Sequence, residues 1–406
     1  MPEGGDRLSA RSRRATLTIA ITAIALDSAL LGLIAPLLPE VAERTGAGEG
    51  ALGLALAGYA IPIIFVSIAI GRRVDRFGRR PFLLAGLALV AVGSALTAVS
   101  ESLPLLIAGR AIQGVGSASS WIAALAIVSD LAPAGRKGQS IGFALAANSA
   151  GALAGPAFGG VLGEELGFAA PFLIVSGIGL ATLLVGWFVL PRVEPAERRS
   201  EEAALKRLRG LLAVGVLPAT LLAVGGAASL GAIDVVIPLD LDERFGLAAS
   251  AIGLVFAGTI LLDALAAPVA GAAGDRVGRR PVAVSGLLLL VVSGALLAAL
   301  GGLGGAIAGL AVYGVAIGAI FAAAVPWLDE SFEEFDRGLA YGGLNVIYAI
   351  GYTIGPIAAG WLLEFGSADA VYMVIAVIAA IGAGLTARAK LGPGPPLAPA
   401  QLSSAR

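Results

Sequence analysis

The chain has no cysteine and no histidine among its 406 residues, and these two absences exclude several kinds of chemistry. Without cysteine there is no disulfide framework, no thiol nucleophile and no cysteine metal site. Histidine is the side chain that usually titrates near neutral pH, so any proton that this chain moves must be carried by carboxyl groups. The sequence therefore predicts no bound metal and no cofactor.

Charged residues are also scarce, at 14% of the chain, whereas 58% of the residues are hydrophobic and the mean hydropathy is +0.92. A soluble domain of this length needs far more charge to cover its surface. The net charge of −1 gives no reason to expect a nucleic-acid partner, and the chain has no G-x-x-x-x-G-K-[ST] loop for ATP phosphates. The composition predicts an integral membrane protein, and nothing in it indicates an enzyme.

Twelve apolar runs are long enough to cross about 30 Å of hydrocarbon as helices. They cover residues 15–38, 51–70, 82–100, 104–130, 139–163, 170–190, 210–239, 250–270, 282–300, 304–326, 339–362 and 370–388. The first run follows a basic stretch, as a signal peptide does, but it is longer, lacks a small-residue cleavage site and leads into eleven further spans. We therefore predict an all-α membrane protein with twelve transmembrane helices.

All but three of the 27 Lys and Arg residues fall on alternate connections between these spans or on the two tails. The exceptions are Arg44, Arg110 and Arg244. Because Lys and Arg accumulate on the cytoplasmic side of a membrane, this distribution predicts a multi-pass protein of the cell (inner or plasma) membrane with both termini in the cytoplasm.

One long charged stretch, residues 191–209, divides the chain into two halves of similar length. Its mixed charges are typical of a solvated linker. The predicted organisation is thus a pair of six-helix bundles with short tails. The segments are a cytoplasmic tail at 1–14, an N-terminal bundle at 15–190, a cytoplasmic linker at 191–209, a C-terminal bundle at 210–388 and a cytoplasmic tail at 389–406.

The two halves repeat one another at an offset of 200 residues. The phrase GRRVDRFGRRP at 71–81 returns as GAAGDRVGRRP at 271–281. Other matched pairs are Gly109 with Gly309, Gly114 with Gly314, Gly151 with Gly351, Gly155 with Gly355, Pro156 with Pro356 and Gly160 with Gly360. Two bundles of the same orientation, related by an axis along the membrane normal, are typical of transporters that bind substrate between the halves near the midplane.

At these motifs the chain resembles the major facilitator superfamily over nearly its whole length. The signature-loop positions of that family hold Gly71, Asp75, Arg76, Gly78, Arg79 and Arg80 in the first half, with Asp275, Arg276 and Arg279 in the second. The fifth span is similar to the motif of drug:proton antiporters through Gly142, Gly151, Gly155, Pro156, Gly159 and Gly160. Two other stretches, 24–39 and 348–360, resemble vesicular amine transporters and their bacterial multidrug-efflux relatives.

The resemblance implies the major facilitator fold, in which the signature loops act as gates. Asp75 would pair with neighbouring arginines and with a helix N-terminus across the bundle interface, and so lock the cytoplasmic side in one state. The second loop keeps Asp275 but has fewer arginines, which predicts a weaker lock. A simpler interpretation, in which the arginines only bind lipid headgroups, stays open.

In the fifth span Gly151, Gly155 and Gly159 recur every four residues and share one helix face. Small residues at this spacing let two helix backbones approach closely in lipid, and Pro156 removes one backbone hydrogen bond. We predict a tightly packed seam that blocks ion leak while the bundles move.

Ionisable side chains inside the spans are the strongest local evidence for function, since each costs at least about 2.5–3.5 kcal/mol at a helix centre. Asp27 lies about 18 Å along the first span, Asp263 is central in the eighth, and Arg110 lies in the fourth. Asp234, near the outer end of the seventh span, is a weaker candidate because interfacial water can reach it. Arg110 has Leu310 as its repeat mate, so its charge is not needed to build the fold.

The resemblance to amine transporters places a substrate-contacting carboxylate at Asp27, and a carboxyl group there can hold a proton or an organic cation but not both. Arg110 would tune the proton affinity of this site, and it approaches Asp27 if the two helices adjoin. The chain departs from those transporters at Tyr59, which replaces a lysine, and at Phe321 and Asn345, which replace acidic residues. The candidate proton and substrate site comprises Asp27, Asp263, Arg110 and Asn345.

Together these features predict a proton-coupled antiporter that exports hydrophobic, cationic organic compounds such as drugs and amines. Its partners are then the small organic substrate, protons and the lipid bilayer, and a monomer suffices because one chain carries both bundles. Two alternatives stay open. One is a facilitator or symporter for a sugar, metabolite or organic anion, with Arg110 binding the anion, and the other is a non-transporting membrane sensor or scaffold.

Overall fold

The computed structural model describes residues 9–133, 137–191, 217–329 and 337–388, and within them every regular element is a helix. Twelve of these described spans are long and apolar enough to cross a membrane, as predicted. The elements are α1 (Ala10–Leu33), η1 (Ala35–Leu37), α2 (Leu38–Thr45), α3 (Glu49–Phe77), α4 (Arg79–Ala98), α5 (Leu103–Asp130), α6 (Lys137–Leu166), α7 (Ala169–Val189), α9 (Leu217–Phe245), α10 (Ala249–Val277), α11 (Arg279–Ala299), α12 (Leu303–Asp329), α13 (Arg337–Phe365) and α14 (Ala368–Arg388).

Two predicted segments lie largely outside the described residues. These are the linker 191–209, from residue 192 on, and the C-terminal tail 389–406. The predicted N-terminal tail 1–14 is described only from residue 9, and α1 begins inside it.

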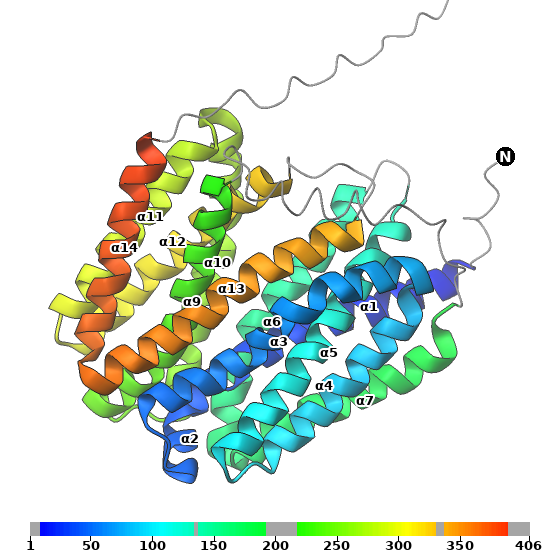
Figure 1. Ribbon diagram of the computed structural model, residues 1–406, viewed down its shortest axis with the longest axis horizontal. Helices are drawn as coiled ribbons and strands as arrows, with labels where there is room; N and C mark the ends of the chain where they lie inside the picture. The colour runs from blue at the N-terminus through cyan, green and yellow to red at the C-terminus, as the bar shows by residue number, and fades with distance from the viewer. Residues whose placement is uncertain (1–8, 134–136, 192–216, 330–336, 389–406) are drawn as a thin grey trace, which may run out of the picture.

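The helices form two bundles that lie side by side (Figure 1). One bundle contains α1 to α7, and the other contains α9 to α14. The bundles meet along two seams, α3 against α13 and α6 against α10. Each seam pairs the second long helix of one half with the fifth long helix of the other, so the interface has the same internal symmetry as the sequence repeat.

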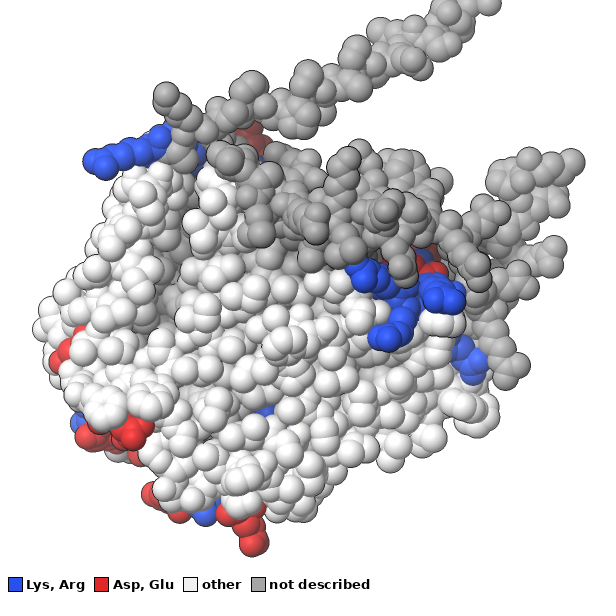
Figure 2. All heavy atoms as spheres, viewed as in Figure 1, with Lys and Arg blue, Asp and Glu red and all other residues white. Residues whose placement is uncertain are grey.

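Charged side chains gather at the two ends of the bundles and leave a wide band between them that is white apart from one small blue patch (Figure 2). We call one end the basic face, since it holds the arginines of 71–81 and 271–281. The opposite end is the acidic face, which holds Glu40, Glu101, Glu164 and Glu364. A band without charge is what the hydrocarbon core of a bilayer requires.

Residues 71–81, expected as a loop, are almost entirely helical. Gly78 alone separates α3 from α4 and reverses the chain with a φ of 88°. Gly278 does the same between α10 and α11 with a φ of 91°. Only glycine adopts this backbone conformation without strain. The predicted spans ended too early because hydropathy falls at the arginines, whereas the helices continue past the apolar band.

The glycine face of α6 packs against α1 of the same half. A Cβ atom added at Gly151, Gly155 or Gly159 would overlap a carbonyl oxygen of α1. The α1 residues opposite are Ala25, Ala29 and Leu33. Because backbones touch directly, this contact replaces side-chain packing. The predicted close seam is present, but this face holds together two helices of one bundle and not the two bundles.

A second face of α6 forms the seam between the bundles. Gly160 lies against the carbonyl group of Ala249 in α10, and Gly253 of α10 lies against the carbonyl group of Pro156. The α3–α13 seam repeats both contacts 200 residues away, with Gly360 against Glu49 and Gly53 against Pro356. All four contacts lie toward the acidic face, so the two bundles are closed against each other there.

Toward the basic face the seam between α6 and α10 is open. Ala146 and Gly142 continue the α10-facing stripe of α6 and are exposed, and a Cβ added at Gly142 or Gly271 meets no described atom within 4 Å. The α3–α13 seam stays in contact farther along, where the Asn345 amide donates a hydrogen bond of 3.3 Å to the Ser67 hydroxyl. The structure is thus closed at the acidic face and separated between α6 and α10 at the basic face.

We expect Gly155→Ala to lower the stability of the protein and Gly142→Ala to leave it unchanged or raise it. Both variants replace a helical glycine and gain the same helix propensity, about 0.5–1 kcal/mol. Only the first forces a Cβ into the Ala29 carbonyl group, and overpacking of that kind costs about 1–3 kcal/mol. Thermal unfolding in detergent, followed by circular dichroism, measures the difference. Equal midpoints for the two variants would contradict the contact.

Candidate functional site

Asp27 lies in the middle of α1 with 8% of its surface exposed. Because Ala25 and Ala29 face α6, the side chain between them turns to the other side of the helix, toward α3 and α5. There the Tyr59 hydroxyl donates a hydrogen bond of 3.0 Å to the carboxylate, and Ser117 is a second polar neighbour. Asp27 is therefore a buried acid inside the N-terminal bundle with two hydroxyl groups beside it.

Arg110 is completely buried in α5 and lies next to the same tyrosine. Its guanidinium carbon is 4.6 Å from the centre of the Tyr59 ring. Its Nη1 donates hydrogen bonds to the Leu30 carbonyl oxygen (3.3 Å) and to the Gln113 side chain (3.0 Å). Arg110 and Asp27 were expected to approach each other, and the structure places the tyrosine side chain in contact with both.

Two nitrogen atoms of Arg110, Nε and Nη2, have no hydrogen-bond partner among the described residues. A buried guanidinium with unpaired N–H groups is costly unless opposite charge is near. That charge comes from the other half: Asp234 of α9 acts electrostatically on Arg110 and accepts a hydrogen bond from Tyr352 of α13. Arg110 and Asp234 thus attract each other across the two bundles, without a direct ion pair among the described residues.

Asp234 is a weaker candidate by sequence than Asp27, Asp263 and Arg110, and the structure gives it a larger part. The seventh span was predicted to end at residue 239, which put this carboxyl group near interfacial water. In the structure α9 continues to Phe245, about three turns beyond Asp234, and the acid is half-buried. The repeat of Glu43-Arg44 as Glu243-Arg244 was the available signal, because α2, which follows α1 in the first half, ends at Thr45, the position matched with Phe245.

A cluster of aromatic side chains in the C-terminal bundle lies within electrostatic reach of three carboxyl groups. Tyr348 and Tyr352 are stacked with ring centroids 5.8 Å apart, and Phe321 lies 6.2 Å from Tyr348. The carboxylates that act electrostatically on Tyr348 are those of Asp27, Asp234 and Asp263. Acids from three helices and both halves thus act electrostatically on one aromatic group. Carboxylates beside aromatic faces are the chemistry that binds an organic cation.

Asp263 differs from the other two acids because the described residues give it no hydrogen-bond or ion-pair partner. It is half-buried in α10, and its carboxylate lies against Gly318 of α12, where an added Cβ would be 3.0 Å from Oδ1. The glycine leaves room for the acid between the two helices. An unpartnered acid inside a membrane span is costly and is typical of a proton or substrate pathway.

Three of the four predicted site residues, Asp27, Asp263 and Arg110, interact with the aromatic cluster of α13. The fourth, Asn345, makes its described hydrogen bond with Ser67 at the α3–α13 seam, toward the basic face. Its described contact therefore joins the bundles.

The signature-motif charges form ion pairs within each half. Asp75 pairs with Arg79 at 3.5 Å, and Arg79 also pairs with Asp130 at the end of α5 at 3.0 Å. In the second half Asp275 pairs with Arg279 at 2.8 Å. These contacts hold the turns between α3 and α4 and between α10 and α11, and the role of Asp75 as a lock across the bundles stays a prediction.

The remaining motif arginines lie at the surface of the basic face. Arg80 donates a hydrogen bond to the carbonyl oxygen of Trp187, while Arg76 and Arg276 are exposed. Gly71, in the last turns of α3, is buried. Exposed arginines at this end can bind lipid headgroups, as the simpler interpretation of the motif requires.

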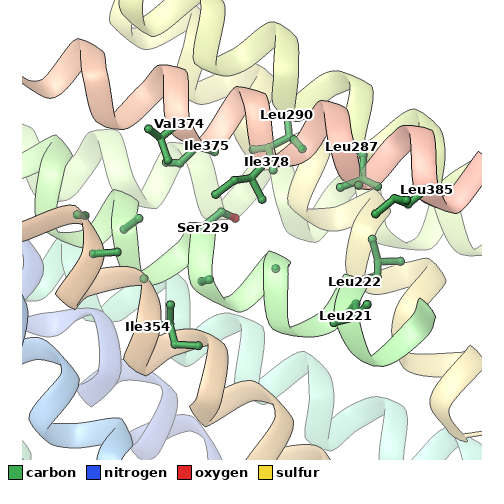
Figure 3. A pocket seen from close by; sticks show the side chains of 18 of the residues that line it. Leu221, Leu222, Ser229, Leu287, Leu290, Ile354, Val374, Ile375, Ile378 and Leu385 are labelled. Atoms are coloured by element: carbon green, nitrogen blue, oxygen red, sulfur yellow. The ribbon is translucent and has the colours of Figure 1, made fainter. Parts of the chain in front are cut away.

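A separate apolar groove lies in the C-terminal bundle between α9, α11, α13 and α14 (Figure 3). Its volume is about 320 Å³, and aliphatic side chains such as Leu222 and Ile378 line it. Ser229 is a polar group in its wall and shares a hydrogen bond of 3.2 Å with Tyr313. The lining contains no charged side chain, so the acids around Tyr348 remain the candidate site for a charged ligand.

The sequence matches the model of the Major Facilitator Superfamily over residues 17–239 and 216–404. It is 31% identical over 280 residues to the tetracycline resistance protein, class D, of Salmonella ordonez, which covers 66% of this chain and 70% of that protein. It is 27% identical over 254 residues to multidrug resistance protein 1 of Bacillus subtilis (strain 168), covering 62% of this chain and 64% of that protein.

Among solved structures, the chain is similar to a bacterial homologue of the human lysosomal transporter Spinster, crystallised in an inward-facing and unoccupied conformation. The two align over 94% of this chain and 98% of that one, with a TM-score of 0.77 and 16% identity. At this identity the similarity concerns the fold.

We expect loss of the Tyr59 hydroxyl to destabilise the protein, because the buried carboxyl group of Asp27 then loses one of its two hydroxyl neighbours and keeps only Ser117. Tyr59→Phe keeps the ring beside Arg110, so its cost is that of one hydrogen bond to a buried group, about 1–3 kcal/mol. Tyr59→Leu removes the ring as well and should cost about 1–2 kcal/mol more. Thermal unfolding in detergent measures both.

A matched control is Tyr372→Phe, which deletes a hydroxyl bonded to Asp240 at 2.9 Å in the other half. The two Tyr→Phe variants should lose similar stability. A wild-type unfolding temperature for Tyr59→Phe, beside a lowered one for Tyr372→Phe, would show that the hydrogen bond to Asp27 contributes nothing.

Proposed function

The chain belongs to the major facilitator superfamily, a family of membrane transporters that are not enzymes, and from that membership we propose that it is a proton-coupled antiporter. In this proposal it exports hydrophobic organic cations by alternating access. Its partners are the substrate, protons and the lipid bilayer. One chain contains both bundles, so a monomer suffices.

The observation that carries the proposal is the group of acids around Tyr348. Asp27, Asp234 and Asp263 act on this one aromatic side chain from α1, α9 and α10. The chain has no histidine, so carboxyl groups are its means of moving protons. Each acid can carry a proton or face a cation but not both, and this exclusion couples the two fluxes in opposite directions.

The proposed cycle starts from the arrangement in the structure, with the acidic face closed and the α6–α10 seam open at the basic face. We take the basic face as cytoplasmic, because Lys and Arg accumulate on that side of a cell membrane, so both termini lie in the cytoplasm. A cation enters from the cytoplasm, binds between the aromatic rings and a carboxyl group, and displaces its proton. The bundles then rock, the acidic face opens, and an outside proton neutralises Asp27 or Asp263 and releases the cation.

The names of the relatives support export of organic compounds. One is a tetracycline resistance protein and another is a multidrug resistance protein, and both align with about two thirds of this chain. Resistance of a cell to a toxic compound is what an exporter of that compound provides.

Arg110 favours a second candidate, a facilitator or symporter for a small organic anion. Its Nε and Nη2 atoms are buried donors without a described partner, and such donors bind carboxylate or phosphate oxygen atoms well. The charges favour the cation. Three acids act electrostatically on Tyr348, and the negative charge of Asp234 already offsets part of the positive charge of Arg110.

Asp27→Asn should reduce proton-driven transport at least tenfold. Asparagine keeps the size of the side chain and still accepts a hydrogen bond from Tyr59, but it neither takes up a proton nor neutralises a cation. The assay uses liposomes with an acidic interior and follows the initial rate of uptake of a fluorescent organic cation in exchange for protons.

Asp242→Asn is the control for loss of one carboxylate, since this residue is exposed on the acidic face. It should transport at the wild-type rate. Wild-type transport by Asp27→Asn would remove Asp27 from the mechanism, and a wild type that takes up none of the cations tested would contradict antiport.

Two dyes with the same aromatic body and opposite charge should separate the two candidate functions. We expect the cation to be taken up at least tenfold faster than the anion. Tyr348→Leu should weaken cation binding about twofold to thirtyfold, because a cation–π contact contributes about 0.5–2 kcal/mol. Ligand-induced thermal shifts measure this affinity. Faster uptake of the anion, with loss of anion binding in Arg110→Leu, would support the second candidate instead.

A further inference from the structure

Two glutamates at the acidic face reach across from one bundle to the other. Glu164, near the end of α6, accepts a hydrogen bond of 3.0 Å from the backbone N–H of Ser250, the second residue of α10. Glu364, near the end of α13, accepts one of 3.1 Å from the backbone N–H of Gly50, the second residue of α3. The two glutamates are 200 residues apart, so the internal repeat makes the same contact twice.

Each of these contacts caps a helix that its own half leaves uncapped. The first N–H groups of a helix have no partner within the helix, and their end of the helix is partially positive. The residues at the N-cap positions of α3 and α10 are Gly48 and Ala248, and neither supplies a side-chain hydrogen bond. Alanine is among the poorest N-cap residues, and glycine has no side chain that could supply an acceptor atom. The missing acceptor therefore comes from the opposite bundle.

The glutamate caps depend on close approach of the bundles. One turn before Glu164, Gly160 touches the carbonyl group of Ala249, and one turn before Glu364, Gly360 touches that of Glu49. Because each glutamate sits on the helix that makes this contact, it reaches the opposite helix only while the two backbones touch. Separation of the bundles at the acidic face breaks both caps at once.

We propose that Glu164 and Glu364 are a pair of positioning residues that hold the acidic face closed, and that their release is part of each opening of that face. This inference rests on the alternating movement of the proposed function. The energetic basis is the attraction between a carboxylate and a helix N-terminus, which is present only in the closed arrangement. Opening returns the carboxylates and the two N-termini to water.

The absence of cysteine makes a direct test simple, because two introduced cysteines can be spin-labelled without removing any native one. Ser102→Cys and Gly302→Cys lie at exposed turns of the acidic face, one in each half, and a Cβ at Gly302 meets no described atom within 4 Å. Double electron–electron resonance in liposomes reports the distance between the labels, which lengthens when the acidic face opens.

In this labelled background the short distance should dominate. Glu164→Gln and Glu364→Gln should each raise the ratio of long to short distances about twofold to fivefold, the effect of one charge at a helix terminus. The two variants act on one equilibrium through separate seams, so the double variant should multiply them, to about fourfold to twenty-fivefold. Alanine at both positions removes the acceptor too and should raise the ratio further.

Glu165→Gln is the matched control, since it removes the same charge one residue away in the same exposed turn. It should leave the ratio unchanged. The proposal is overturned if the double glutamine and double alanine variants keep the distance distribution of the labelled wild type, or if Glu165→Gln shifts it as much as Glu164→Gln.

Uptake of the organic cation by the same samples separates this outcome from failure of the proposed function. Transport in the wild type with an unchanged distance distribution in the double variants would overturn the role of the glutamates alone. A wild type that takes up no cation would contradict antiport, whatever the distances show.

Discussion

The contact between α6 and α1, in which glycine brings two helix backbones together, determines which way Asp27 faces. Ala25 and Ala29 occupy the side of α1 that faces α6, so Asp27 faces Tyr59 and the buried core of the N-terminal bundle. The adjoining face of α6 meets α10 of the other half. One helix, α6, thus makes both the contact that sets the neighbours of Asp27 and a contact with the opposite bundle. The glycine motif of this helix therefore serves both the interior of one bundle and the interface between two.

The internal repeat builds the scaffold, and the charges inside the membrane depart from the repeat. The glycine contacts at the seams, the chain reversals at Gly78 and Gly278 and the glutamate caps occur in both halves. The positions paired with Asp27, Asp234, Asp263 and Arg110 hold Ala227, Ile34, Ile63 and Leu310. The two seams are built from matched contacts, whereas each charge inside the membrane occurs in one half only.

The charges near the centre of the bundles depend on one another. Away from water electrostatic interactions are stronger, so the acids, Arg110 and the tyrosine hydroxyl groups act as one network. Arg110 and Asp234 lie in different halves, so the attraction between their charges acts across the interface of the two bundles.

Hydropathy and spacing were sufficient to predict the twelve helices, because a bilayer demands long apolar runs. The same patterns single out Asp27, Asp263 and Arg110, because a bilayer penalises each charge within a span, and their role as a binding site stays a prediction. They misplaced the ends of α3 and α9. Hydropathy falls where the charged residues begin, whereas both helices continue through those residues beyond the apolar band. Only the tertiary structure decided that Tyr59 lies beside both Asp27 and Arg110, and that Asp234 opposes Arg110 from the other half. Which helix faces meet, and which distant residues thereby become neighbours, follows from the packing of backbones in three dimensions, and hydropathy along a chain carries no information about it.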